Sequence, residues 1–196
     1  GGTELALAMA HRLGPDAGVA LIERGPAIAG ELPAGARRRL RAALAELGVA
    51  VHTETEARAF SADGVATAAG RTIPAGFVTA AVGARPAPWL ATSGLAVTPG
   101  GFVEVDARLR SSSHPEVFAV GDVAHMTASP RPKAGVFAVR QGPVLNAALR
   151  AALAGAELPT YAPQGDYLRL ISLGGKRALA LKYGVVAGGR GPLGAL

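Results

Sequence analysis

The spacing of apolar and polar positions in the first half of the chain predicts helices and strands in alternation. An alanine- and leucine-rich run begins at Gly2 and stops at Gly14-Pro15, as an amphipathic helix would. Apolar residues then predict a strand at 19–22, a helix at 34–47 and a second strand at 49–52. The connections are long enough for the two strands to pair in parallel, which is typical of an α/β fold.

The second half of the chain shows shorter and more varied patterns. Residues 57–73 alternate between apolar and polar positions around Gly-containing turns, which predicts a small antiparallel meander. The apolar runs 77–82 and 117–120 predict two buried strands. We further expect a short helix, a strand, a long helix and a hairpin at 89–94, 102–105, 135–154 and 167–181.

The final residues are rich in glycine, and we expect them to fray. The glycines are Gly184, Gly188, Gly189, Gly191 and Gly194. Prolines at 86 and 88 forbid a continuing element, so we place a domain boundary just before them. The predicted domains are a dinucleotide-binding domain at 1–84, a second domain at 85–156 and a C-terminal region at 157–196.

Composition favours a folded protein and narrows its chemistry. Hydrophobic residues make up 49% of the 196 residues and charged residues 17%, which argues against disorder. The chain has no cysteine, so these residues contain no redox-active disulfide, thiolate nucleophile or cysteine zinc site, as would suit a cytoplasmic protein. No apolar stretch is long enough for a membrane span, and the spacing of the histidines predicts no metal site.

The net charge of +6 raises the question of a nucleic-acid partner. The basic residues are scattered, apart from Arg37-Arg38-Arg39 and Arg41 on a predicted helix. The other face of that helix carries Leu40, Leu44 and Leu47, so the arginines are typical of a solvated helix face. We therefore predict no nucleic-acid binding and leave open an attraction to anionic membrane surfaces.

The start of the chain carries the features of a dinucleotide site. Gly2 stands where the last glycine of a G-x-G-x-x-G motif would let a helix pack closely on a sheet, and Glu4 follows in the first helical turn. Glu23 comes directly after the next strand, where a carboxylate binds the adenosine ribose and repels a 2′-phosphate. Glu23 therefore favours NADH, Arg24 leaves NADPH open, and the alternative for Glu23 is a solvated charge.

A second candidate site lies at Gly121-Asp122, directly after the predicted strand 117–120. Ligands of open α/β sheets bind outside the carboxyl ends of strands. A glycine allows close approach to the backbone, and a carboxylate accepts two hydrogen bonds from a sugar-like diol. The alternative is an ordinary loop.

The order of these pieces resembles the two-dinucleotide-binding-domain flavoproteins, the superfamily of glutathione reductase and the single-subunit NADH:quinone oxidoreductases. Residues 117–124 resemble the family's second FAD motif, which implies that Asp122 holds the ribityl chain and that Gly121 lies beside it. Val82-Gly83-Ala84-Arg85-Pro86 resembles the crossover between the two domains, with valine where threonine is more usual. This resemblance adds Gly83 to the cofactor-binding residues. It implies an NAD domain followed by the second part of an FAD domain.

Residues 131–142 narrow the resemblance to NADH-dehydrogenase-like proteins sometimes found fused to selenophosphate synthase. The predicted helix start at Gly135 and Val136 offers free N–H groups and partial positive charge, which suits the negative pyrimidine edge of a reduced flavin. Lys133 is the candidate catalytic residue, which adds to that charge, faces an acceptor or is simply solvated. Gln141 is expected to be an ordinary helix-face residue.

The resemblance implies an FAD-dependent oxidoreductase that passes hydride from NAD(P)H to flavin and electrons to a small acceptor such as a quinone. It also implies a fused or partner selenophosphate synthase domain, and a location in the cytoplasm or at the inner face of the membrane. The missing cysteines count against the disulfide reductases. The alternative from another class is a non-enzymatic nucleotide-binding or regulatory module, because fold alone does not require turnover.

The resemblance further implies that the first FAD segment is absent from these 196 residues. The residues that remain contact only part of each cofactor, while the entropic cost of binding is unchanged. We therefore expect the isolated chain to bind no FAD at micromolar concentrations, to oxidise no NADH and to aggregate. The visible spectrum of the purified chain tests this: flavin bands near one equivalent would contradict the expectation.

Overall fold

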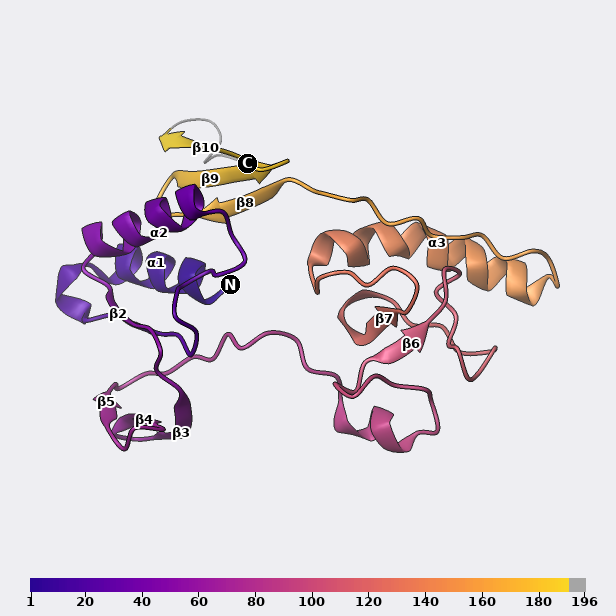
Figure 1. Cartoon of the computed structure of the whole chain (residues 1–196), viewed down its shortest axis with the longest axis horizontal. Helices are drawn as coiled ribbons and strands as arrows, with labels where there is room; N and C mark the ends of the chain where they lie inside the picture. The colour runs from indigo at the N-terminus through magenta and orange to yellow at the C-terminus, as the bar shows by residue number, and fades with distance from the viewer. Residues whose placement is uncertain (191–196) are drawn as a thin grey trace. The chain divides into compact units, whose positions relative to one another are not determined.

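The computed structural model describes residues 1–190 and divides the chain into two compact units (Figure 1). Unit 1 consists of Gly1–Val82 together with the chain from Asp166 onward, and unit 2 is Gly83–Gly165. Unit 2 is therefore continuous in sequence, whereas unit 1 is built from two separate stretches. The three predicted domains at 1–84, 85–156 and 157–196 stay a prediction.

Unit 1 begins with the helices and strands that the apolar spacing predicts. They are α1 (Gly2–Leu13), β1 (Ala20–Ile22), α2 (Ala34–Glu46) and β2 (Ala50–His52). Strands β1 and β2 pair in parallel, with Ala20 opposite Ala50, which confirms the α/β character of this region.

The antiparallel meander is also confirmed. It consists of β3 (Ala57–Ser61), β4 (Gly64–Thr67) and β5 (Thr72–Pro74), with β4 in the centre. The strand predicted at 77–82 is wrong: these residues form no regular element, and Phe77 and Val82 are 72% and 76% exposed. A strand needs a neighbour for its backbone hydrogen bonds, and no segment among residues 1–190 pairs with this one.

The C-terminal part of unit 1 is an antiparallel sheet of β8 (Arg169–Ser172), β9 (Arg177–Lys182) and β10 (Val185–Arg190). The predicted hairpin is confirmed, but the expected fraying is wrong for Val185–Arg190, which pairs with β9 along its length. The turn before β10 is closed by the Asp166 carboxylate, whose Oδ2 accepts from the Tyr183 amide at 2.5 Å. Backbone hydrogen bonds from Tyr183 and Tyr167 lower the pKa of Asp166. Gly191 and Gly194 lie outside the described residues.

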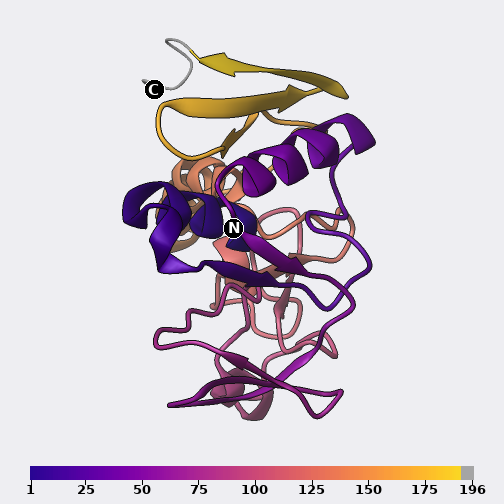
Figure 2. The ribbon, with the colours of Figure 1, turned by 90° about the vertical axis from the view of Figure 1, so that its left-hand side faces the viewer.

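Helices α1 and α2 share one apolar core with the C-terminal sheet (Figure 2). Its most buried members include Leu7 of α1, Leu40 and Leu44 of α2, and Leu179 and Leu181 of β9. Burying such a leucine contributes about 1.5–3 kcal/mol, so the sheet contributes much of the stability of unit 1. Aliphatic side chains thus build this core almost without aromatic residues.

The turn between β8 and β9 rests directly on α1. Gly174 and Gly175 both have positive φ, and a methyl group on Gly175 would lie 2.9 Å from the His11 ring. The same addition at Gly174 would lie 3.0 Å from the Leu7 carbonyl oxygen. Only glycine allows this approach, which fixes the sheet against the helix.

Unit 2 contains a small parallel pair, β6 (Val103–Val105) and β7 (Ala124–Met126), and the long helix α3 (Gly135–Leu153). A short helical turn spans Pro88–Thr92, close to the predicted short helix. Among the residues that the structure describes, no helix is long and apolar enough to cross a membrane.

The strand predicted at 117–120 is wrong. The strand in this region, β7, begins at Ala124, four residues after the predicted strand ends. Phe118 makes only a single bridge to Arg110, and the Ala119 amide donates to the Leu109 carbonyl at 3.0 Å. Gly121 then takes a positive φ of 68°, which breaks the extended backbone before β7. The Gly-Asp pair therefore lies in a turn that enters a strand rather than at the end of one.

Candidate functional site

The centre of the candidate flavin site is a hydrogen bond between the Gly121 turn and helix α3. The Gly121 amide donates to Oε1 of Gln141 at 2.6 Å, and Gln141 is only 5% exposed. Its Nε2 lies 4.0 Å from the Met126 sulfur. Gln141 is thus buried and in contact with the Gly-Asp segment. The sequence alone predicts only an ordinary residue on the helix face. Its position in the sequence did not indicate this contact, because the contact depends on which face of α3 meets the turn.

Gly121 could be no other residue without strain. Its φ of 68° lies in the left-handed region, and an added methyl group would stand 3.3 Å from the Ala138 side chain. The absence of a side chain therefore lets the turn lie close to α3.

Asp122, next in the chain, is exposed at this turn. Its carboxylate accepts no hydrogen bond from residues 1–190, and its charge acts to raise the pKa of Lys133. An ionised carboxylate with free lone pairs is the acceptor that a row of hydroxyl groups requires.

Lys133 is half-buried and makes two contacts within unit 2, and its catalytic role stays a prediction. Its ammonium group donates to the Ala124 carbonyl oxygen and lies 4.2 Å above the centre of the Phe102 ring. Partial burial lowers the pKa of Lys133, and the charge of Asp122 partly offsets that effect. The lysine therefore fixes its own segment to β7 while leaving positive charge beside Asp122.

The first turn of α3 contributes backbone donors. No side chain caps the helix at Ala134, and Gly135 and Val136 stand at its start, with Gly135 exposed. Uncapped N–H groups and the helix dipole give this end a partial positive charge.

A small hollow of about 20 Å³ lies among these groups, roughly the space of one water molecule. Its walls include Gly121, Asp122, Lys133, Phe137 and Gln141. A flavin ring is far too large for this hollow, so it would lie across the surface that Asp122 and the α3 N-terminus present. The donor set fits the cofactor: a carboxylate for ribityl hydroxyls, and N–H groups with positive charge for an anionic ring edge.

The candidate nucleotide site lies in unit 1, at the carboxyl end of β1. Glu23 follows β1 directly and is half-buried, and its Oε1 accepts from the Gly25 amide at 2.6 Å. A methyl group on Gly25 would lie 3.2 Å from that oxygen, so this second glycine makes room for the carboxylate. The other carboxylate oxygen has no partner among residues 1–190 and is free for a ribose hydroxyl.

Gly2 begins α1 close to the same strand. A methyl group on Gly2 would lie 3.5 Å from Ala81 and 3.8 Å from Leu21, which are ordinary contact distances. Close packing alone therefore does not require glycine at this position, contrary to the reason the motif suggested. The cofactor role of Gly2 stays a prediction.

Two other predicted residues lie apart from these groups. Glu4 turns toward the C-terminal sheet, where its Oε1 accepts from the Ser172 amide at 3.1 Å. Gly83 is exposed with a φ of 86° at the start of unit 2. Their cofactor roles also stay predictions.

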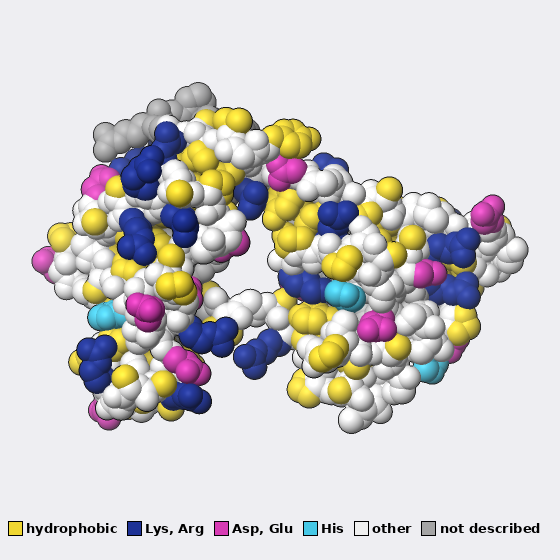
Figure 3. Space-filling model, in the orientation of Figure 1, with side chains coloured by type: hydrophobic (Ala, Val, Ile, Leu, Met, Phe, Trp, Pro, Cys, Tyr) yellow, Lys and Arg dark blue, Asp and Glu magenta, His cyan; other side chains and the backbone are white. Residues whose placement is uncertain are grey.

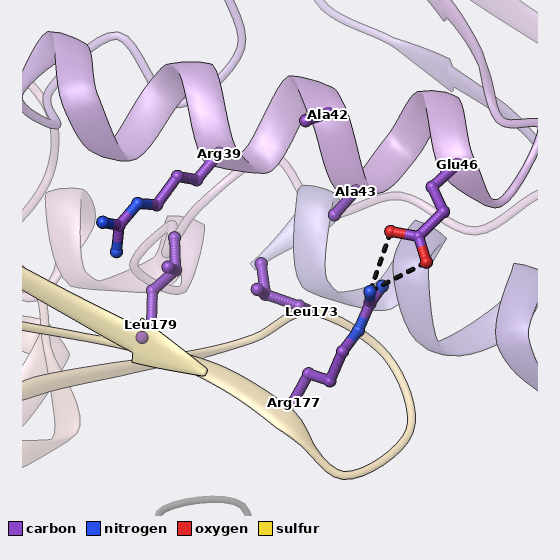
Figure 4. Close-up of a pocket in the computed structure, with 8 residues that line it drawn as sticks. Arg39, Ala42, Ala43, Glu46, Leu173, Arg177 and Leu179 are labelled. Carbon is purple, nitrogen blue, oxygen red and sulfur yellow. Dashed lines mark hydrogen bonds and ion pairs between the residues drawn. The ribbon is translucent and has the colours of Figure 1, made fainter. Parts of the chain in front are cut away.

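The larger hollow, about 330 Å³, lies between α2 and the C-terminal sheet and contains none of the predicted residues (Figure 4). The Arg177 guanidinium crosses one end and binds both carboxylate oxygens of Glu46, at 2.8 and 2.9 Å. Arg39 extends from α2 over Leu179 at the other end. This arrangement joins a helix to a sheet through a paired charge and apolar walls.

Basic side chains gather around α2 and the neighbouring sheet on the face shown in Figure 3. Of the four arginines predicted on a solvated helix face, Arg38, Arg39 and Arg41 are exposed and Arg37 is half-buried. Within residues 1–190, no cluster of histidine and acidic residues could hold a metal ion.

The mixed α/β architecture with the small C-terminal sheet is the fold of the two-dinucleotide-binding flavoprotein oxidoreductases. The family model described as pyridine nucleotide-disulphide oxidoreductase matches residues 1–142, more than half of the chain. The chain belongs to this family, whose members use FAD and NAD(P)H.

Three relatives illustrate the match. The biphenyl dioxygenase system ferredoxin–NAD(+) reductase component of Paraburkholderia xenovorans (strain LB400) is 40% identical over 89 residues, which are 43% of this chain and 21% of that protein. An FAD-dependent pyridine nucleotide-disulphide oxidoreductase from Desulfovibrio vulgaris superposes with a TM-score of 0.69 at 28% identity, covering 92% of this chain and 47% of that one. Sulfide:quinone oxidoreductase from Aquifex aeolicus gives a TM-score of 0.73 at 16% identity, covering 95% and 50%. The last likeness is one of fold alone, and the chain spans about half the length of either structure.

We expect Gly121→Ala to destabilise the protein by about 1–2 kcal/mol through the left-handed conformation alone, with crowding against Ala138 in addition. Gly35→Ala is the control, because Gly35 lies in helix α2 without a positive φ and an added methyl group there would meet no atom within 4 Å. This control should not destabilise the protein, since alanine is a better helix former than glycine. Denaturant unfolding measures both, and equal midpoints would contradict the strain at Gly121.

Proposed function

We propose that this chain is part of an FAD-dependent oxidoreductase that passes hydride from NAD(P)H to the flavin and electrons onward to an acceptor. The arrangement around Asp122 carries the proposal. A carboxylate with free lone pairs stands beside Lys133, which carries positive charge, and near an uncapped helix start. Membership of a family that uses FAD and NAD(P)H supports this interpretation.

In this proposal each residue binds or orients, and the cofactor supplies the chemistry. When bound, FAD would supply the two-electron chemistry that links the nicotinamide to the acceptor. Asp122 accepts hydrogen bonds from the ribityl hydroxyls, and the amides at Gly135 and Val136 face the electron-rich ring edge. Lys133 adds positive charge to the same surface and donates one of its three N–H groups to the Ala124 carbonyl oxygen. This hydrogen bond fixes the ammonium group in place, which supports an electrostatic role for Lys133.

Glu23 holds the nucleotide in the same proposal. The Gly25 amide fixes one carboxylate oxygen, so the side chain is oriented before the ribose arrives. The free oxygen accepts from a ribose hydroxyl, and its charge disfavours a 2′-phosphate. The enzyme is therefore proposed to prefer NADH.

Two electron acceptors are candidates, a quinone and a ferredoxin. The predicted NADH-dehydrogenase-like activity would reduce a quinone. The relative from P. xenovorans is named as a ferredoxin–NAD(+) reductase component, which favours a ferredoxin as the second candidate acceptor. Steady-state NADH oxidation with a soluble quinone and with a ferredoxin separates the two. The predicted selenophosphate synthase partner and the contact with the inner face of the membrane remain further proposals.

For Asp122→Ala in the full-length protein, we expect flavin to dissociate on gel filtration. The change removes a charge-assisted hydrogen bond that contributes about 1.5–3 kcal/mol. The exposed Glu116→Ala in the same unit removes a carboxylate away from the turn and should leave the FAD content unchanged. Stoichiometric, tightly held FAD in the Asp122→Ala variant would exclude Asp122 as a flavin ligand. If the protein is instead a non-enzymatic nucleotide-binding module, the unaltered protein will oxidise no NADH even with FAD bound.

For Glu23→Ala, we expect the KM for NADH to rise and the preference for NADH over NADPH to narrow, because both the ribose acceptor and the repulsive charge are lost. Glu31→Ala is the control, since Glu31 is an exposed carboxylate of the same unit. The ratio of kcat/KM values for the two cofactors is the measurement. An unchanged ratio in the Glu23 variant would remove this residue from the nucleotide site.

A further inference from the structure

We propose that Gln141 is the positioning residue of the flavin site and acts through Asp122. The inference rests on the proposed function, in which Asp122 binds the ribityl chain. Gln141 itself is 5% exposed and is not presented to a cofactor. Its effect on binding therefore passes through the backbone that it holds.

The geometry places the Gln141 amide on both sides of Asp122 in the chain. Oε1 accepts from the Gly121 amide, one residue before Asp122, at 2.6 Å. Nε2 lies 4.0 Å from the sulfur of Met126, four residues after it. One side chain thus contacts the segment that carries the carboxylate both before and after it. The Val120–Gly121 peptide, which carries that N–H, is held against α3 as a result, and this places the residue that follows, Asp122.

The chemistry of the side chain favours positioning over simple packing. An apolar residue of similar length would fill the same space without the desolvation that burial of an amide requires. Unlike an apolar residue, the amide supplies an acceptor for the Gly121 N–H. Without that acceptor the N–H would have no partner and would be free to turn away from α3. Glycine at 121 has the conformational freedom to do so, since it has no side chain to lock it.

The test is a double-mutant cycle between Gln141 and Asp122 in the full-length protein, with the dissociation constant of FAD measured by flavin fluorescence. Gln141→Met keeps the length of the side chain and removes the acceptor, whereas Gln141→Glu keeps an acceptor oxygen. Gln164→Met is the matched control, because Gln164 lies in the same unit and its side-chain nitrogen has no hydrogen-bond partner. Each is made with Asp122 intact and with Asp122→Ala.

With Asp122 intact, Gln141→Met should weaken FAD binding about tenfold, the effect of one hydrogen bond. In the Asp122→Ala background it should weaken binding no further, because the group it positions is gone. Gln141→Glu keeps the acceptor oxygen and should therefore keep the Gly121 amide protected from hydrogen exchange, and Gln164→Met should change nothing. Hydrogen exchange at the Gly121 amide should accelerate in Gln141→Met alone.

Two results would overturn the inference while the proposed function stands: unchanged FAD affinity in Gln141→Met, or an equal loss with and without Asp122. Unchanged affinity in Asp122→Ala would overturn the proposed function, and this inference with it. If Gln141→Met does not fold, Gln141→Asn replaces it in the cycle. Gln141→Asn keeps the amide but shortens the side chain by one methylene, so the acceptor oxygen no longer reaches the Gly121 N–H. The loss of FAD affinity should again depend on Asp122, as expected for Gln141→Met.

Discussion

The hydrogen bond between the Gly121 amide and the Gln141 side chain holds the Gly-Asp turn of unit 2 against helix α3. It thereby joins the turn that carries Asp122 to the helix that supplies the uncapped amides. Lys133 adds a second attachment three residues beyond the turn, at the Ala124 carbonyl. The carboxylate, the ammonium group and the helix start are consequently grouped by contacts to one short backbone segment.

Unit 1 depends on a different constraint, the burial of aliphatic surface. Its helices carry small and medium side chains, so the leucines of β9 must complete the core that α1 and α2 begin. Polar contacts then specify the register: Glu4 meets the backbone of β8, and Arg177 meets Glu46. The nucleotide candidate Glu23 lies apart from these contacts and is oriented by its own local turn.

Local periodicity was sufficient to predict the three long helices, the parallel pair of unit 1, the meander and the first hairpin. It failed where strand formation depends on a partner, because the apolar runs at 77–82 and 117–120 look like strands whether or not a neighbour is present. The glycine-rich β10 was missed for the opposite reason, since an existing edge strand ordered a sequence of low propensity. At the site, Asp122 and Glu23 could be found from their positions along the chain. The role of Gln141 could not, because it depends on which face of α3 meets the turn.

The order of the two units along the chain affects how the molecule is made. Unit 2 is continuous, so its residues are all present before the C-terminal sheet leaves the ribosome. Helices α1 and α2 precede unit 2 in the chain, whereas the leucines of β9 that finish their core follow it. During translation α1 and α2 therefore keep their apolar faces uncovered until the whole of unit 2 has been synthesised. Unit 1 can be completed only after unit 2, in contrast to domains that fold one after another in chain order.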